Sequence, residues 1–243
     1  MTNERTAIVT GAGKRIGAAI AAALVADGWA VLGHVHKDVD QVPARAAQIV
    51  ADLAEPDCAT RIFAAAEGMP PVRLLVNNAA RFEWDGFGEF SVEQFDAHMA
   101  VNVRAAALLI DRLAANHAAG DALAVNLLDS KLSAPNPDYL SYTLSKGALE
   151  MLTELAARAL APRSIRVNGI APGLMLRSSG QSEENFNVMH GNNPLRRGVE
   201  AEDVVAALRY FIGATAVTGQ VITIDSGQRF LGLERDVQFL GPR

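Results

Sequence analysis

The sequence contains very little cysteine. Cys58 is alone in a chain of 243 residues, so an intramolecular disulfide is excluded. The five histidines are scattered and lack the close Cys/His clustering of a zinc site, so we expect no bound metal. Because proteins without disulfides are typical of reducing compartments, we expect a cytoplasmic location.

Blocks of positive charge and long apolar runs are also lacking. The 22 Lys and Arg residues are outnumbered by 27 Asp and Glu residues, and no basic block could follow a phosphate backbone. The polar residues 2–6 do not have the charged and then apolar pattern of a signal peptide, and no uninterrupted apolar stretch reaches membrane-spanning length. We therefore expect neither a nucleic acid nor a membrane as a partner.

Short strand-like runs alternate with alanine-rich stretches of helical periodicity. Parallel strands need long crossover connections, so continuous apolar strands separated by helices indicate a sheet covered on both faces. The sequence therefore predicts a single doubly wound α/β Rossmann domain over residues 1–243, with about seven parallel strands and helices on both faces. The expected strands are 6–10, 30–35, 48–51, 74–77, 122–128, 165–171 and 220–224, and the expected long helices are 16–26, 91–117 and 139–160.

The composition changes at residues 174–200. This stretch is polar, rich in Gly and Asn and poorly periodic, which predicts a mobile loop that covers the substrate within the same domain. Arg177, Met189 and His190 are candidates for substrate contact, although solvated loop residues are the default interpretation.

A glycine-rich turn, TGAGKRIG at residues 10–17, directly follows the first expected strand and leads into an alanine-rich helix. Gly11 and Gly13 allow a sharp turn and the close approach of a pyrophosphate, and Gly17 allows close contact between helix and strand. The N-terminus of the helix offers unpaired N–H groups and the positive end of its dipole. The order strand, turn, helix favours a dinucleotide cradle over an ordinary turn.

The end of the second strand decides which nicotinamide cofactor is bound. A carboxylate there binds the ribose 2′-OH of NAD and repels a 2′-phosphate, but no carboxylate appears before Asp38. Lys14, Arg15 and Lys37 instead place cationic groups near the adenosine side. The sequence therefore favours NADPH.

Three further polar residues near this end allow two interpretations each. His34 and His36 alternate onto one strand face as a metal pair would, but without further ligands nearby we favour a structural or phosphate-side role. Asp52, at the end of the third strand, either accepts a hydrogen bond from an adenine amino group or is a solvated strand-end residue.

Tyr142 and Lys146 lie four residues apart on an expected helix, so both side chains project from one face. A nearby ammonium stabilises a phenolate, so we expect Lys146 to lower the pKa of Tyr142 and make it a proton donor near neutral pH. Such a pair is often only a helix-surface pair. Its company gives it weight: NNAA at 77–80, Asn102, Asp129 and APG at 171–173.

This set of motifs, in this order, resembles the short-chain dehydrogenase/reductase family from TGAGKRIG to VTGQVITIDSG at 217–227. The resemblance implies that Tyr142 protonates the substrate, that Lys146 holds the nicotinamide ribose and tunes Tyr142, and that Asn102 supports a water relay. It also implies that Asn77 and the following turn line the cofactor, and that the protein is a homotetramer. The expected NADP(H)-binding residues are Gly11, Gly13, Lys14, Arg15, Ile16, Gly17, His36, Lys37, Asp52, Leu53, Asn78, Ala79, Lys146, Pro172 and Gly173.

Two departures from the general family pattern concern the substrate. Arg15 stands where most members have the middle glycine of the turn, and Asp129 stands where most have a serine that donates to a substrate carbonyl. A carboxylate is a poor donor unless it is protonated. In both respects, and in Phe82 after the NNAA turn, the chain resembles the pteridine reductases, including dihydromonapterin reductase-like enzymes. The expected substrate-binding residues are then Arg15, Phe82, Asp129 and Tyr142.

In that subgroup an aromatic ring sandwiches the pterin against the nicotinamide, and the Asp/Tyr pair relays protons to ring nitrogens. Phe82 is equally interpretable as a loop anchor, and Asp129 as an acceptor for a loop N–H group. Two other functions stay open: a reductase of ordinary carbonyls such as 3-oxoacyl thioesters or diketones, and a non-catalytic NADP-binding sensor. The retention of Asn102, Tyr142 and Lys146 speaks against the sensor.

Overall fold

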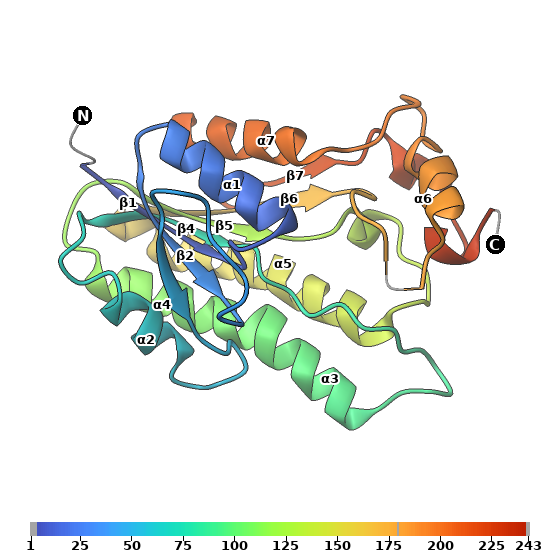
Figure 1. Ribbon diagram of the computed structural model, residues 1–243, viewed down its shortest axis with the longest axis horizontal. Helices are drawn as coiled ribbons and strands as arrows, with labels where there is room; N and C mark the ends of the chain where they lie inside the picture. The colour runs from blue at the N-terminus through green and yellow to red at the C-terminus, as the bar shows by residue number, and fades with distance from the viewer. Residues whose placement is uncertain (1–3, 179, 242–243) are drawn as a thin grey trace.

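A computed structural model describes residues 4–178 and 180–241. Its centre is a seven-stranded sheet, in which every pairing is parallel and the strands follow the order β3-β2-β1-β4-β5-β6-β7 (Figure 1). The predicted doubly wound α/β fold is confirmed. The strands are β1 Thr6–Thr10, β2 Ala30–Val35, β3 Ala47–Val50, β4 Val72–Asn77, β5 Ala122–Leu127, β6 Ile165–Pro172 and β7 Val221–Ile224.

Helices cover both faces of this sheet (Figure 1). On one face α1 packs against α7, and on the other α2 packs against α4 and α4 against α5. The helices are α1 Arg15–Ala26, α2 Cys58–Ala64, α3 Val92–Met99, α4 Ala105–Asn116, α5 Leu140–Leu160, α6 Glu183–His190 and α7 Ala201–Gly213.

Strand periodicity divides the hydrophobic core between the two faces. In β1, Ala7 and Val9 join the cluster under α1 and α7, whereas Ile8 between them joins the cluster under α2, α4 and α5. Both clusters consist mainly of aliphatic side chains, and their members are almost fully buried. The sheet is therefore a rigid platform, and the order of its strands reverses between β1 and β4, where open α/β sheets bind ligands.

The expected helix over 91–117 is interrupted. Between α3 and α4 the residues Ala100–Arg104 form a π-helical turn, and Asn102 lies within it. Such insertions in a helix are rare and often occur at functional sites.

The stretch 174–200 differs from the irregular loop that its composition predicts. Residues 183–190 form α6, whose N-terminus is capped by Ser182 accepting from the Asn185 N–H group. The sequence of α6 does not have the apolar periodicity that predicts the other helices. Among the described residues no helix has the length and apolar character needed to cross a bilayer.

Candidate active site

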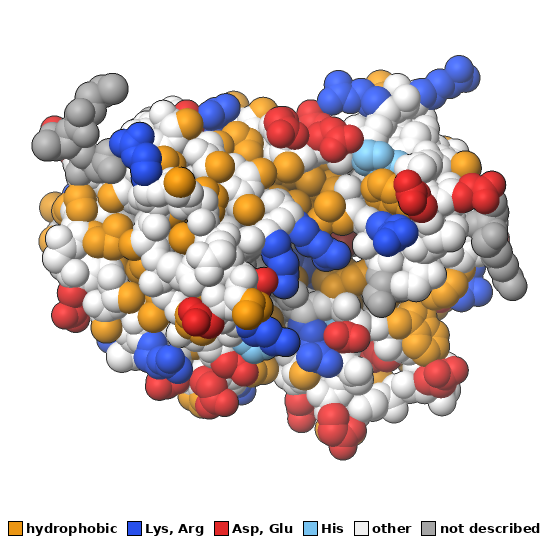
Figure 2. Space-filling view, viewed as in Figure 1, with side chains coloured by type: hydrophobic (Ala, Val, Ile, Leu, Met, Phe, Trp, Pro, Cys, Tyr) orange, Lys and Arg blue, Asp and Glu red, His pale blue; other side chains and the backbone are white. Residues whose placement is uncertain are grey.

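A cleft of about 1750 Å³ opens at the carboxyl ends of the strands. Small-molecule pockets typically measure about 300–1000 Å³, so this cleft has room for a dinucleotide and a second molecule. Figure 2 shows Lys and Arg side chains gathered around a hollow near the middle of one face. The lining of the cleft lacks Asn77 and Asn102 but brings together the other expected catalytic, cofactor-binding and substrate-binding residues: Gly11, Gly13, Lys14, Arg15, Ile16, Gly17, His36, Lys37, Asp52, Leu53, Asn78, Ala79, Phe82, Asp129, Tyr142, Lys146, Pro172 and Gly173.

The glycine-rich turn fits tightly between β1 and α1. A Cβ atom on Gly17 would lie 2.1 Å from the Gly11 carbonyl oxygen, so only glycine permits this approach, and Gly11 itself has a left-handed φ of +67°. Lys14, the N-cap of α1, makes no side-chain hydrogen bond to the helix. The first N–H groups of α1 are therefore not capped by that side chain and suit an anionic group.

The turn also explains the unusual Arg15. This residue has a φ of +53°, in the left-handed region that glycine occupies without strain. The chain thus keeps the backbone shape of a glycine position and adds a guanidinium group at the mouth of the cradle. We interpret the strain as the cost of that charge.

The NNAA turn is held against the end of β1. The Thr10 hydroxyl accepts from the N–H groups of Asn78 and Ala79, both at 3.0 Å, and the Asn78 side chain donates to the Thr10 carbonyl at 2.8 Å. Below it, the Asn77 side chain donates to Asn126 on the neighbouring β5. These bonds fix the floor of the cleft beside the glycine turn.

Charged groups surround the expected adenosine end. Lys14 Nζ lies 3.4 Å from Asp40 Oδ2, and His36 Nε2 lies 3.9 Å from Asp52 Oδ2. Asp52 also accepts a hydrogen bond from the Ala54 N–H group at 2.8 Å, so one of its oxygens belongs to a local turn. Lys37 is exposed at the same end.

His34 has a structural role in this region. Its ring is buried, Nδ1 accepts from the Gly11 N–H group at 3.3 Å, and Nε2 donates to the Ala51 carbonyl at 2.9 Å. Burial lowers the pKa of His34, which matches a neutral ring that both accepts and donates. The described residues contain no group of three or more His, Cys, Asp or Glu side chains placed to hold a metal.

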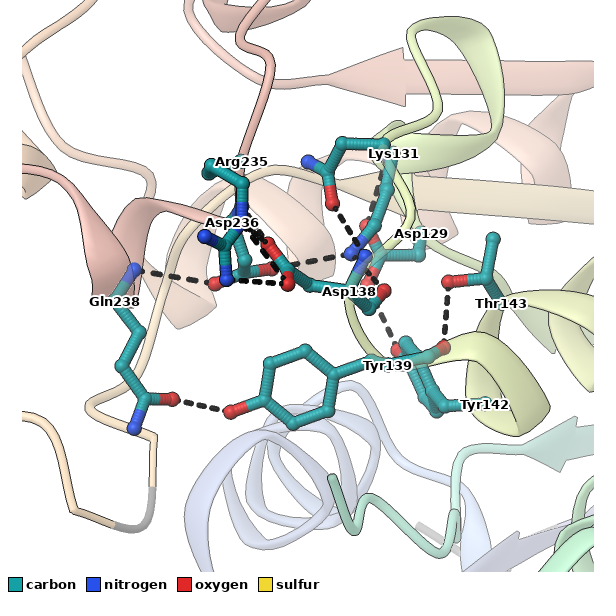
Figure 3. Close-up of polar contacts among 10 residues, drawn as sticks. Asp129, Lys131, Asp138, Tyr139, Tyr142, Thr143, Arg235, Asp236 and Gln238 are labelled. Atoms are coloured by element: carbon teal, nitrogen blue, oxygen red, sulfur yellow. Dashed lines mark hydrogen bonds and ion pairs between the residues drawn. The ribbon is translucent and has the colours of Figure 1, made fainter. Parts of the chain in front are cut away.

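Tyr142 and Asp129 form the polar centre of the cleft (Figure 3). The Tyr142 hydroxyl donates to Asp129 Oδ2 at 2.7 Å, and Asp129 Oδ1 accepts from the Lys131 N–H group at 2.9 Å. The carboxylate can reach both because β5 ends at Leu127 and Asp129 is the N-cap of a 3-10 turn, Ser130–Ser133. Both interpretations of Asp129, loop acceptor and partner of Tyr142, therefore hold at once.

The acid–base properties differ from one sequence prediction. Burial raises the pKa of Tyr142 well above its ordinary value, and the Asp129 carboxylate raises it further, so the expected lowering by Lys146 was wrong for this structure. Burial also raises the pKa of Asp129 and lowers that of Lys146 to about 8. Lys146 Nζ donates to the Leu127 carbonyl at 2.6 Å and lies 5.7 Å from the centre of the Tyr142 ring. Tyr142 is thus held in its protonated, donating form.

Asn102 supports the wall of the cleft from behind. Its side chain accepts from the Arg81 N–H group at 2.7 Å and donates to the Arg81 carbonyl at 3.0 Å and to Ser145 Oγ at 2.9 Å. The π-helical turn gives it this reach toward α5. Its side chain therefore fixes the backbone directly before Phe82.

Phe82 lies between the Asp129–Tyr142 pair, called the dyad below, and an aromatic neighbour. Its ring stacks on Tyr139 with centroids 4.3 Å apart and meets the edge of Tyr142 at 4.6 Å. The side chain remains 38% exposed and lines the cleft. Phe82 is both an anchored loop residue and a candidate stacking surface.

Only one of the three candidates from residues 174–200 reaches the cleft. Arg177 lines it, whereas Met189 is buried and His190 stacks on Phe186 and bonds to the Val199 carbonyl. Met189 and His190 therefore pack α6 instead of contacting a substrate. Sequence reasoning also missed Lys131, Arg235 and Asp236 in the lining, because they follow no motif.

Comparisons with known proteins find similarity to reductases over almost the whole chain. The sequence pattern of the family described as Enoyl-(Acyl carrier protein) reductase matches residues 11–229. L-xylulose reductase of Mesocricetus auratus is 32% identical over 92% of this chain and 96% of its own.

Two solved structures extend the comparison. FolM Alternative dihydrofolate reductase 1 from Brucella canis, complexed with NADP, is 36% identical with a TM-score of 0.89, covering 95% of this chain and 96% of its own. A short chain dehydrogenase from Burkholderia cenocepacia J2315, in complex with NADP, is 29% identical with a TM-score of 0.83, covering 93% and 98%.

Proposed function

Because the chain belongs to the short-chain dehydrogenase/reductase family of oxidoreductases, we propose that it is an NADPH-dependent reductase whose substrate is a dihydropterin, reduced at a C=N bond. The observation that carries the proposal is the hydrogen bond from Tyr142 to Asp129 in the cleft. The NADP-bound FolM structure, at 36% identity, supports both the cofactor and the substrate class.

The residues of the cradle fit NADP(H). Gly11 and Gly17 keep the turn low, the N-terminus of α1 offers N–H groups to the pyrophosphate, and Arg15 and Lys37 supply cations for the 2′-phosphate. Lys146 would hold the nicotinamide ribose. When bound, NADPH supplies the hydride.

The chain itself supplies the proton. Tyr142 would deliver its hydroxyl proton to the nitrogen of the C=N bond whose carbon receives the hydride. The resulting phenolate would regain a proton from solvent by way of Asp129, whose raised pKa allows the carboxyl group to carry one. Protonation of nitrogen requires a donor and no oxyanion hole, which agrees with a carboxylate where a ketone reductase has a serine.

Phe82 supports a flat substrate. Its partly exposed ring beside Tyr142 offers a stacking surface for a heterocycle, and such aromatic contacts add about 0.5–1.5 kcal/mol beyond burial. Asn102 holds the preceding backbone, so the ring is presented from a fixed loop.

A second candidate is the reduction of an ordinary carbonyl. The resemblance to L-xylulose reductase favours it, since L-xylulose is a ketose. Asp129 disfavours it, because the carboxylate accepts hydrogen bonds from Tyr142 and from the Lys131 N–H group instead of donating one.

A crystal of the protein soaked with NADP and a dihydropterin tests the site. We expect the pterin ring between Phe82 and the nicotinamide, with a ring nitrogen within hydrogen-bonding distance of Tyr142 or Asp129. A pterin bound elsewhere, with Phe82 uncovered, would contradict the assignment.

We also propose that the chain is a single domain and that four copies of it assemble into a homotetramer. The support comes from α5, which exposes Leu144, Met151 and Leu155 along its length. Sedimentation equilibrium tests the proposal, and a monomer at micromolar concentration would contradict it. The cytoplasmic location stays a prediction from the sequence.

A further inference from the structure

Tyr139, the residue directly before α5, has an unusual backbone conformation. Its φ of +57° lies in the left-handed region, where a tyrosine is strained. A residue persists in such a conformation only where its surroundings hold it, and such residues cluster at functional sites. The contacts of Tyr139 show what holds it.

Two aromatic rings contact the Tyr139 ring. Phe82 stacks on it with centroids 4.3 Å apart and planes 17° apart, and Phe239, near the end of the chain, lies 6.4 Å away at 28°. Lys131 Nζ adds a cation 5.4 Å from the ring centre. Tyr139 is buried, whereas Phe82 lines the cleft, so Tyr139 can act on a substrate only through Phe82.

The segment 233–239 is hydrogen-bonded to Asp138, which precedes Tyr139, and to Tyr139 itself (Figure 3). The buried Asp138 carboxylate accepts from the Arg235 guanidinium at 2.8 Å and from the Asp236 N–H group at 2.7 Å. Lys131 Nζ bridges the Asp138 carbonyl at 2.6 Å and Asp236 Oδ2 at 3.3 Å. The Tyr139 hydroxyl donates to Gln238 Oε1, so the ring is held at its tip as well.

The same segment forms part of the cleft. Leu233, Arg235, Asp236 and Val237 line it, on the side of the dyad where Lys131 links Asp236 to the turn that starts at Asp129. The apolar side chains of Leu233 and Val237 and the charged side chains of Arg235 and Asp236 thus form the substrate side of the cleft.

We propose that Tyr139 is a positioning residue that sets the plane of Phe82, and that the C-terminal segment 233–239 holds Tyr139 in place and closes the substrate side of the cleft. The binding of a flat substrate then depends on residues almost a hundred positions beyond the dyad. The inference rests on the proposed function only in that Phe82 contacts the substrate.

The test compares flat and open-chain substrates in matched variants. Tyr139→Asn removes the ring but retains a residue that tolerates the left-handed conformation, so the backbone turn before α5 is kept. Tyr139→Phe restores the ring without the hydroxyl. Arg235→Gln removes the ion pair with Asp138. Arg209→Gln is its control, since Arg209, on α7 and outside the cleft lining, makes a similar two-point pair with Asp27 at the end of α1.

Kinetics are measured with NADPH and dihydrobiopterin, phenanthrenequinone or diacetyl. We expect Tyr139→Asn and Arg235→Gln to raise KM for the two flat compounds by about three- to tenfold, the range for loss of one stacking contact. In Tyr139→Asn, kcat, KM for diacetyl and the Kd of NADPH should stay within about twofold, because only the stacking of a flat substrate on Phe82 is affected. Tyr139→Phe should restore most of the affinity, and Arg209→Gln should match the wild type.

Three outcomes would overturn the inference. An equal rise of KM for flat and open-chain substrates in Tyr139→Asn would indicate a general structural role, and no rise would remove Tyr139 from substrate binding. An unchanged Arg235→Gln would remove the C-terminal segment. Wild-type protein that reduces phenanthrenequinone but not dihydrobiopterin would contradict the proposed function alone. Amide hydrogen exchange at residues 236–240, expected to be faster in Arg235→Gln than in Arg209→Gln, tests the docking of the segment without any turnover.

Discussion

The Tyr142 hydroxyl donates a 2.7 Å hydrogen bond to the Asp129 carboxylate, thirteen residues earlier in the chain. Tyr142 is buried and Asp129 is half-buried in the wall of the cleft, and each affects the protonation of the other. Burial raises both pKa values, so the pair retains a transferable proton across the neutral range. The chemistry of the site therefore follows from two residues acting together.

Replacing Tyr142 with phenylalanine removes the proton donor and keeps the ring. General acid catalysis contributes roughly 10²–10⁴-fold, so kcat should fall by at least 10²-fold, while the Kd of NADPH stays within about twofold. Stopped-flow NADPH oxidation and fluorescence titration measure the two quantities. Tyr210→Phe, on the exposed surface of α7, is the control and should be fully active. Full activity of Tyr142→Phe would remove the residue from the mechanism.

Replacing Asp129 with serine exchanges a carboxylate acceptor for a hydroxyl donor. The variant should lose roughly 10²-fold in kcat/KM for a dihydropterin, because the proton relay is broken, and should gain activity toward diacetyl. Steady-state assays with both substrates give the ratio. If the two values change in parallel, Asp129 does not determine the substrate class.

Replacing Arg15 with glycine removes a cation and relieves a strained φ of +53°. KM for NADPH should rise about tenfold, which corresponds to one charge-assisted contact with a phosphate, while KM for NADH should not change. The melting temperature should not fall, because glycine adopts this conformation freely. Arg45→Gly is a matched control, since Arg45 also has a left-handed φ, of +74°, but lies outside the cleft lining. Equal effects on both cofactors would refute a role in recognising the 2′-phosphate.

Replacing Lys146 with methionine should inactivate the protein and stabilise it at pH 7. Burial lowers the pKa of Lys146 from 10.5 to about 8, so below pH 8 the folded state carries a buried charge at a cost of about 3 kcal/mol. Between pH 8 and 10.5 the unfolded state binds more protons, so this cost disappears as the pH rises.

Loss of the hydrogen bond to the Leu127 carbonyl offsets part of the gain. The free energy of unfolding should therefore rise by about 1–2 kcal/mol at pH 7, with the gain vanishing near pH 10. Urea denaturation at both pH values checks this. Lys37→Met, at an exposed position, should show no such pH-dependent gain. A lower free energy of unfolding for Lys146→Met than for the wild type at pH 7 would contradict the predicted direction of the effect.

The sequence predicted what depends on local patterns. Apolar strands and alanine-rich helices gave the doubly wound sheet, and the spacing of Tyr142 and Lys146 placed both on α5. It did not predict α6, because only three of its eight residues are apolar and they form no continuous stripe. The raised pKa of Tyr142 was missed because it depends on burial, which spacing does not reveal.

Contacts between distant segments were the other gap. The ion pair between Asp138 and Arg235 spans 97 residues, and neither residue belongs to a motif. The pair forms only because the chain after β7 runs back to the start of α5. A periodic pattern carries no information about such a contact.

The central claim is that the Asp129–Tyr142 pair serves a dihydropterin. The most direct measurement is the ratio of kcat/KM for dihydrobiopterin or dihydromonapterin to kcat/KM for diacetyl and L-xylulose, with NADPH and the wild-type protein. The account predicts a ratio of at least about 10², because only the pterin uses both the proton relay and the Phe82 surface. Reduction of the carbonyl compounds with no reduction of either dihydropterin would contradict it.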